Sequence, residues 1–135
     1  MTETRRPRML VIDDDPSVRE VMSYLLVSFG YDCETAADGV AGVARFDEGG
    51  WDLVVTDLAM PGMNGWEVSE AIRRRSPTMP IILVTGLSGP EVSQRACERG
   101  VEVVPKPFRL ETFAAVVAKA LQANPSFETS VSPQN

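Results

Sequence analysis

The sequence contains no histidine and only two cysteines, and both scarcities exclude kinds of site. Without histidine, neither a Ser-His-Asp nor a Cys-His catalytic arrangement can be built from this chain. Cys33 and Cys97 are far apart and form no C-x-x-C pair, so a zinc site is not expected and both are interpreted as reduced structural thiols. Nucleophilic or acid–base chemistry must therefore come from carboxylates, Lys106, hydroxyl groups or a thiol.

Long apolar runs are also missing. No stretch of the 135 residues approaches the ~20 apolar residues that a membrane helix needs. Residues 1–8 are polar and basic, and no signal peptide follows them. We therefore predict a cytoplasmic protein that does not contact a membrane.

Positive charge is scarce too, since the net charge is −6, which argues against direct nucleic-acid binding. Arg73, Arg74 and Arg75 form a short basic run. We interpret it as a solvated helix end, where cations suit the helix dipole. A docking patch for an acidic partner is the alternative.

The sequence does contain a strict alternation of short apolar runs with segments of helical periodicity. From Val18 to Phe29, for example, apolar residues recur at spacings of three and four, which predicts one apolar helix face. The predicted strands span 9–12, 31–36, 52–56, 81–84 and 101–104, and the predicted helices 16–29, 37–48, 66–75, 90–99 and 110–121. Five such units predict an α/β fold, an open and mostly parallel sheet with helices on both faces. The more polar second strand is expected near an edge.

Polar side chains follow four of these strands, at the same edge of the predicted sheet. Asp13 and Asp14 follow the first strand, Asp57 the third and Thr85 the fourth, and the fifth runs into Lys106. Converging carboxylates repel one another, and Mg²⁺, which prefers oxygen ligands, would relieve that repulsion. A carboxylate can also act as a nucleophile toward phosphorus, with cationic and hydroxyl donors stabilising the phosphoryl oxygens. The set predicts an aspartate that accepts a phosphoryl group.

The chain resembles the response-regulator receiver domains of two-component signalling. Four segments carry the resemblance, in this order: MLVIDDDPSVRE, DLVVTDLAMPGMNG, IILVTGLSG and VVPKPF. The likeness covers residues 8–123, which leaves 1–7 as an N-terminal extension and 124–135, rich in Ser, Pro, Gln and Asn, as a flexible tail. It implies a flavodoxin-like (βα)5 fold, a doubly wound five-stranded parallel sheet in strand order 2-1-3-4-5.

The resemblance also implies a site and a mechanism. Asp57 would receive a phosphoryl group from a sensor histidine kinase or a phosphotransfer protein, and the domain would relay the event by conformational change to a downstream effector protein. Asp14, Asp57 and the backbone carbonyl of Ala59 would bind Mg²⁺ directly, and Asp13 would hold a metal-bound water. The protein would catalyse only its own phosphorylation and dephosphorylation, and a homodimer is left open.

Two further residues have roles implied by the family. Thr85 matches the hydroxyl that moves to the new phosphoryl group. Lys106 matches the lysine that pairs with phosphate, and its bond to Pro107 is expected to be cis. Asp15 lies in the same acidic run, and we favour a role as helix cap, with Pro16 at the first helical position, over a metal role.

Three positions depart from the family pattern. Val103 stands where receivers usually carry an aromatic ring. In the family the movement of the threonine matched by Thr85 is coupled to rotation of that ring, so this coupling is in doubt here. Ala59 and Leu87 stand where side chains influence attack of water on the phosphoryl group, and neither can position a water. We therefore predict slow autodephosphorylation.

Two other functions remain as alternatives. Asp13, Asp15 and Ser17 fit the D-x-D-x-[TS] pattern of haloacid-dehalogenase-type phosphatases, but no acidic cluster follows the fourth strand. A receiver-like interaction module that is never phosphorylated is the second alternative, favoured only by Val103. Trp66, Val92 and Phe113 are interpreted as core residues, with partner contact as the alternative.

Overall fold

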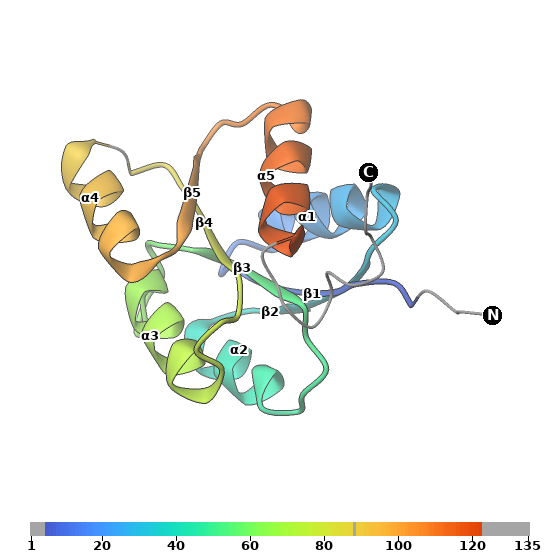
Figure 1. Ribbon diagram of the computed structural model, residues 1–135, viewed down its shortest axis with the longest axis horizontal. Helices are drawn as coiled ribbons and strands as arrows, with labels where there is room; N and C mark the ends of the chain where they lie inside the picture. The colour runs from blue at the N-terminus through green and yellow to red at the C-terminus, as the bar shows by residue number, and fades with distance from the viewer. Residues whose placement is uncertain (1–4, 88, 123–135) are drawn as a thin grey trace.

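The computed structural model describes residues 5–87 and 89–122, which form five strands and five helices in strict alternation (Figure 1). The strands are β1 (Arg8–Ile12), β2 (Asp32–Ala36), β3 (Leu53–Asp57), β4 (Ile81–Thr85) and β5 (Glu102–Pro105). The helices are α1 (Pro16–Ser28), α2 (Gly39–Phe46), α3 (Gly65–Arg75), α4 (Pro90–Arg99) and α5 (Leu110–Gln122).

The five strands form one parallel sheet in the order β2-β1-β3-β4-β5, which confirms the predicted topology. The polar strand β2 lies at an edge, as predicted. Strands β3 and β4 lie inside the sheet and every one of their residues is buried, as is typical of parallel strands covered on both faces.

Alternate residues of the strands point to opposite faces and build two separate cores. Leu10, Val54 and Leu83 belong to a cluster that packs under α2, α3 and α4. Met9 and Val55 belong to the other, which packs under α1 and α5. Figure 1 shows these two helical layers on either side of the sheet. The side chains within the strands therefore pack in the two cores, and candidate functional side chains are found at the strand ends.

Local signals in the sequence place the helix ends. Asp15 caps α1 by accepting a hydrogen bond from the Ser17 N–H at 2.9 Å, with Pro16 as the first helical residue, so the predicted capping role is confirmed. Helix α2 is shorter than the predicted 37–48 at both ends: Asp38 caps its start by accepting from the Ala41 N–H, and the helix ends at Phe46, with Asp47 as its C-cap residue. Gly100, with a φ of 66°, ends α4 in the left-handed region that glycine favours.

Two expectations about side chains need correction. Val21, predicted on the inward face of α1, has 54% of its surface exposed. The arginine run is not simply a solvated helix end: Arg73 donates to the carbonyls of Met79, Arg99 and Gly100, and Arg75 pairs with Asp47. Tertiary neighbours engage these two cations, which the spacing of the residues could not indicate.

The predicted core residues Trp66 and Phe113 are both buried, and Val92 is partly buried against the α2–α3–α4 cluster. Of the predicted N-terminal extension only residues 5–7 are described, and there Arg5 makes a two-point ion pair with Asp52. The predicted tail, 124–135, lies outside the described residues.

Among the described residues, no helix has both the length and the apolar composition needed to cross a membrane.

Candidate functional site

The predicted site residues converge at the carboxyl-terminal edge of the sheet. Asp13 and Asp14 follow β1, Asp57 ends β3 and Thr85 ends β4. Lys106 follows β5, and its backbone N–H donates to the Thr85 carbonyl at 2.8 Å. Strand order β2-β1-β3 reverses the direction of winding next to β1, which leaves the crevice where open α/β sheets bind ligands.

Three carboxylates in this crevice could hold a metal ion. One oxygen from each of Asp13, Asp14 and Asp57 lies within 4.8 Å of the others. Asp13 and Asp57 are buried, whereas Asp14 is exposed. Asp15, one residue further on, is occupied at the helix end and does not belong to this cluster.

Asp13 is the most deeply enclosed of the three, with none of its surface exposed. Its Oδ1 accepts a hydrogen bond from the Asp15 N–H at 2.9 Å. Its Oδ2 is buried and has no hydrogen-bond partner; the Lys106 ammonium is 3.7 Å away. A buried charged oxygen without a hydrogen bond is costly. The oxygen is therefore suited to a ligand that the cluster would bind, and an all-oxygen donor set of this kind fits Mg²⁺.

Asp57 is 8% exposed and its charge is poorly solvated. Burial raises the pKa of Asp57, the nearby Lys106 lowers it, and the negative charges of Asp13 and Asp14 raise it. The backbone N–H of Leu58, 2.8 Å from Oδ1, also lowers this pKa. The net effect is a raised pKa, so a carboxylate held here is destabilised until a cation or covalent bond relieves it.

Thr85 and Lys106 bring donors to the same crevice. Lys106 lies with its ammonium nitrogen 3.7 Å from both Asp13 Oδ2 and Asp57 Oδ1, in reach of either but tightly bonded to neither. Thr85 is fully buried, and its hydroxyl oxygen accepts a hydrogen bond from the Leu87 N–H at 3.0 Å. The Lys106–Pro107 bond is cis, as predicted.

The three positions that depart from the family pattern lie in different surroundings. Ala59 lies two residues beyond the end of β3 and is exposed. Leu87 is 52% exposed beside Thr85. Val103 is partly buried against the α2–α3–α4 core. None of these three side chains carries a hydrogen-bonding group that could hold water against a phosphoryl group.

Two residues that shape the site were not found from the sequence. Arg19 on α1 donates to the Asp13 carbonyl at 2.8 Å and so holds the acidic loop. Gly65 begins α3 against the end of β3: a Cβ there would lie 2.5 Å from the Asp57 carbonyl oxygen and 2.8 Å from the Leu58 Cα. The glycine-containing loop was visible in the sequence, but nothing in its pattern distinguished Gly65 as the point of contact.

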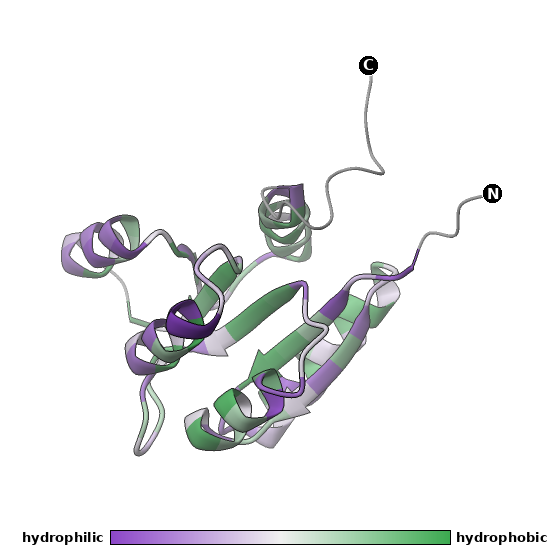
Figure 2. Ribbon diagram, turned by 60° about the horizontal axis from the view of Figure 1, so that its bottom comes forward, coloured by the Kyte–Doolittle hydropathy of each residue, from purple (hydrophilic) through white to green (hydrophobic). Residues whose placement is uncertain are grey.

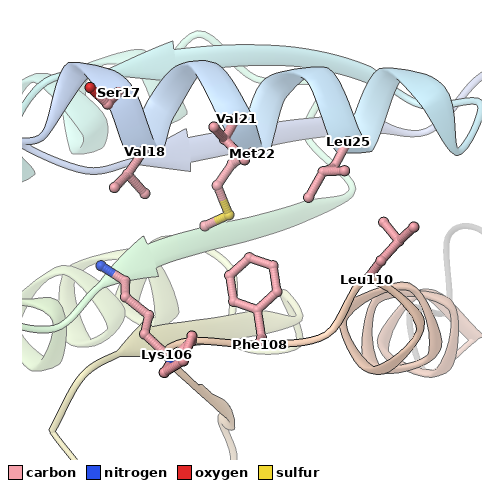
Figure 3. A pocket seen from close by; sticks show the side chains of 9 residues that line it. Ser17, Val18, Val21, Met22, Leu25, Lys106, Phe108 and Leu110 are labelled. Atoms are coloured by element: carbon pink, nitrogen blue, oxygen red, sulfur yellow. The ribbon is translucent and has the colours of Figure 1, made fainter.

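A groove of about 780 Å³ adjoins the crevice between α1 and the segment that leads into α5. Val18, Val21, Met22 and Leu25 line one side, and Phe108 and Leu110 the other (Figure 3). Lys106 also lines the groove, while the three aspartates do not. The groove is therefore too apolar to bind phosphate and is better suited to an apolar surface placed next to the site.

Comparison with known proteins places the chain in a family. Residues 9–118 match the family described as "Response regulator receiver domain". The sensor histidine kinase RcsC of Escherichia coli is 36% identical over 104 residues, which are 76% of this chain and 11% of that protein. The chain thus spans only a small part of this curated relative's length.

Solved structures agree. The chemotaxis protein CheY4 of Vibrio cholerae is 32% identical with a TM-score of 0.81, over 86% of this chain and 99% of that one. The response regulator TrrA of Thermotoga maritima, solved in complex with Mg²⁺ and BeF, is 33% identical with a TM-score of 0.77, over 84% of this chain and 98% of that one. The parallel sheet, the acidic crevice and these matches together show that the chain belongs to the family of response regulator receiver domains.

Proposed function

We propose that this domain accepts a phosphoryl group on Asp57 and passes the signal on by a change of conformation. The observation that carries the proposal is a buried aspartate whose Oδ1 lies 3.7 Å from the Lys106 ammonium and whose carboxylate clusters with those of Asp13 and Asp14. Oδ1 of Asp57 already accepts a hydrogen bond from Leu58, so the nucleophilic oxygen would be Oδ2. Attack of this oxygen on the phosphorus of a phosphohistidine would form an oxygen–phosphorus bond. The nitrogen–phosphorus bond would break, and the imidazole nitrogen of the donor would be the leaving group.

Asp13, Asp14 and Asp57, with the backbone carbonyl of Ala59, would hold Mg²⁺. When bound, the ion would neutralise charge on the transferring phosphoryl oxygens. The buried, unbonded Oδ2 of Asp13 supports this assignment, because a metal-bound water would supply the hydrogen bond that it lacks. Lys106 would approach the phosphoryl group from its present position, since its ammonium is not yet within hydrogen-bond distance of Asp57.

Thr85 would donate its hydroxyl proton to a phosphoryl oxygen. Its hydroxyl oxygen now accepts from the Leu87 N–H, so a move toward the phosphoryl group would loosen the turn after β4. This would connect the chemistry to α4, which begins three residues beyond Leu87.

The phosphodonor would be a sensor histidine kinase or a phosphotransfer protein, a proposal supported by the chain's membership of the receiver family and by its match to part of a sensor histidine kinase. We infer that an apolar helix of the donor occupies the groove between α1 and Leu110. The groove borders Lys106, so a helix lying there would hold its phosphohistidine beside Asp57. An effector protein downstream, a homodimer, the domain limits 8–123 and a cytoplasmic location stay predictions.

Phosphotransfer profiling tests the proposal. The wild type, incubated with Mg²⁺ and the phosphorylated histidine kinases of the same genome, should acquire label, and Asp57→Asn should not. The matched control is Asp52→Asn, which alters a buried aspartate at the other end of β3. Label retained in Asp57→Asn would overturn the assignment of the acceptor.

The unphosphorylated interaction module is separated from this proposal by the same experiment together with beryllofluoride titration. A module of that kind would take no label and would not be stabilised by Mg²⁺ with beryllofluoride. The phosphatase alternative is disfavoured because Asp15, which its motif requires, is engaged as the cap of α1.

A further inference from the structure

Helix α4 is attached to the domain by little apolar surface. Ala96 is its one buried residue, and Val92 is partly buried against the core beneath. Figure 2 shows α4, on the left, as predominantly hydrophilic. Its N-cap residue, Gly89, provides no side-chain hydrogen bond. Since packing of an apolar face normally supplies most of a helix's stability in a protein, other contacts must position α4.

Besides its packing on the sheet near β5, α4 is contacted by one stripe of α3. Trp66, Glu70 and Arg73 are spaced four and three residues apart, so they share a face. Opposite them on α4 lie Arg95 and Arg99. We call these five residues the α3–α4 interface. Its members are mostly charged, which sets it apart from the apolar packing of the other helices on the sheet.

The two ends of the α3–α4 interface are held differently. At one end the Arg73 guanidinium donates to the Arg99 carbonyl at 3.0 Å and to the Gly100 carbonyl at 2.8 Å, which ties down the last turn of α4. At the other end the guanidinium carbons of Arg95 and Arg99 lie 4.9 and 5.6 Å from the centre of the Trp66 ring. Stacked cations of this kind are attracted to the ring but can slide across it.

The Trp66 end lies next to the phosphoacceptor. Gly65, which precedes Trp66, donates its backbone N–H to the Leu58 carbonyl at 2.8 Å. Its Cα lies so close to the strand end that a Cβ would overlap the Asp57 carbonyl oxygen. A displacement of Asp57 and Leu58 would therefore move the first turn of α3. The Trp66 ring, on which Arg95 and Arg99 lie, would move with it.

We propose that the stacking of Arg95 and Arg99 on Trp66 is the contact through which occupancy of the aspartate crevice repositions α4. The inference rests on the proposed phosphoryl-accepting function. The last turn of α4, which includes the backbone of Arg99, stays attached through Arg73, and the helix pivots there as Arg95 in an earlier turn moves over the ring. Trp66 thereby takes a coupling role in a chain where Val103 offers no ring.

The test uses Trp66 as its own reporter. The chain has two tryptophans, and Trp51→Phe leaves Trp66 alone. Trp51 is remote from the crevice, because it precedes β3 and packs under Arg8 at the opposite edge of the sheet. Fluorescence emission is recorded in EDTA, with Mg²⁺, and with Mg²⁺ plus beryllofluoride, and melting temperature is measured in parallel to establish that the mimic binds. If Trp51→Phe does not fold, the indole N–H resonances of the wild type supply the same readout.

Beryllofluoride with Mg²⁺ should raise the melting temperature and change both the emission and the indole resonance of Trp66. Arg95→Met should remove most of the change in emission, whereas Arg74→Met, which alters an exposed arginine of α3, should leave it intact. An unchanged Trp66 signal in protein that beryllofluoride stabilises would overturn this inference and leave the proposed function standing. Equal effects of Arg95→Met and Arg74→Met would overturn it as well. No stabilisation by beryllofluoride would overturn the proposed function, and this inference with it.

Discussion

The ammonium of Lys106 lies 3.7 Å from Oδ1 of Asp57, although their strands are separated in the sheet by β4. The same ammonium is 3.7 Å from the buried Oδ2 of Asp13. One cation thus serves two carboxylates and cannot fully compensate either. Burial still outweighs it at Asp57, whose pKa is raised. The crevice is electrostatically incomplete without a further cation, and this has measurable consequences for stability.

Replacing Asp57 by asparagine should stabilise the metal-free protein at neutral pH. A raised pKa means that folding favours the protonated form, so the contribution of Asp57 to stability is present below its unfolded pKa of about 3.9 and is lost as pH rises through the folded value. Above that range the ionised carboxylate opposes folding. The uncharged amide of the variant would not oppose it, and the amide oxygen can still accept from Leu58. We expect a higher melting temperature for Asp57→Asn in EDTA at neutral pH, with the advantage shrinking in acid. A variant that melts below the wild type at neutral pH would contradict this.

Added Mg²⁺ should stabilise the wild type more than Asp14→Asn, because Mg²⁺ binds the folded form through the acidic cluster. Asp15→Asn is the matched control: it removes a charge from the next residue, but asparagine caps helices about as well as aspartate. The measurement is the shift in melting temperature on titration with Mg²⁺ in each variant. A loss of the Mg²⁺ effect in Asp15→Asn as large as in Asp14→Asn would show that Asp15 contributes to the metal site after all.

Phosphorylated Asp57 should lose its phosphoryl group slowly, and Ala59→Asn should accelerate the loss. Ala59 is exposed beside the crevice and has no group that can orient an attacking water, whereas an asparagine amide can. Ala59→Val adds bulk without a hydrogen-bonding group and serves as control. Decay of labelled protein over time measures the rate. The idea fails if Ala59→Asn decays at the wild-type rate or more slowly.

Arg73→Met should destabilise the fold by about 1 kcal/mol, because it removes hydrogen bonds to three backbone carbonyls, two of them at partly buried positions. Its guanidinium is partly buried, and burial lowers its pKa. It satisfies three backbone carbonyls, and methionine can replace only the apolar part of the side chain. Arg74→Met, at an exposed position of the same helix, should be nearly neutral. Denaturant unfolding of both variants is the measurement, and equal stabilities would refute the structural role of Arg73.

Much of the architecture follows from local patterns. The apolar run at Leu53–Val55 predicts a strand covered on both faces, and β3 is completely buried. The boundaries of the elements depend on caps, and Asp15 was readable as one because a proline follows it. The start of α2 was less well predicted. Asp38 caps it, but no proline follows Asp38 to mark it as a helix cap in the sequence.

The convergence of Asp13, Asp57, Thr85 and Lys106 could also be predicted, because parallel strands bring their carboxyl ends to one edge whatever their side chains. The outward position of Val21 could not, because an apolar helix face is wider than the strip that the sheet covers. Half of its surface remains exposed beside the groove.

What the sequence determined by itself is therefore the sheet, the set of oxygen and nitrogen groups at its edge, and the family to which they point. Hydrophobic periodicity and the positions of strand ends are properties of short segments, so they do not depend on how the side chains pack. Three features were decided only by the tertiary structure. Oδ2 of Asp13 has no hydrogen-bond partner, Gly65 lies against the Asp57 carbonyl, and Arg73 donates hydrogen bonds to the end of α4. These are distances between segments remote in the chain, and they depend on how side chains pack once the elements have met.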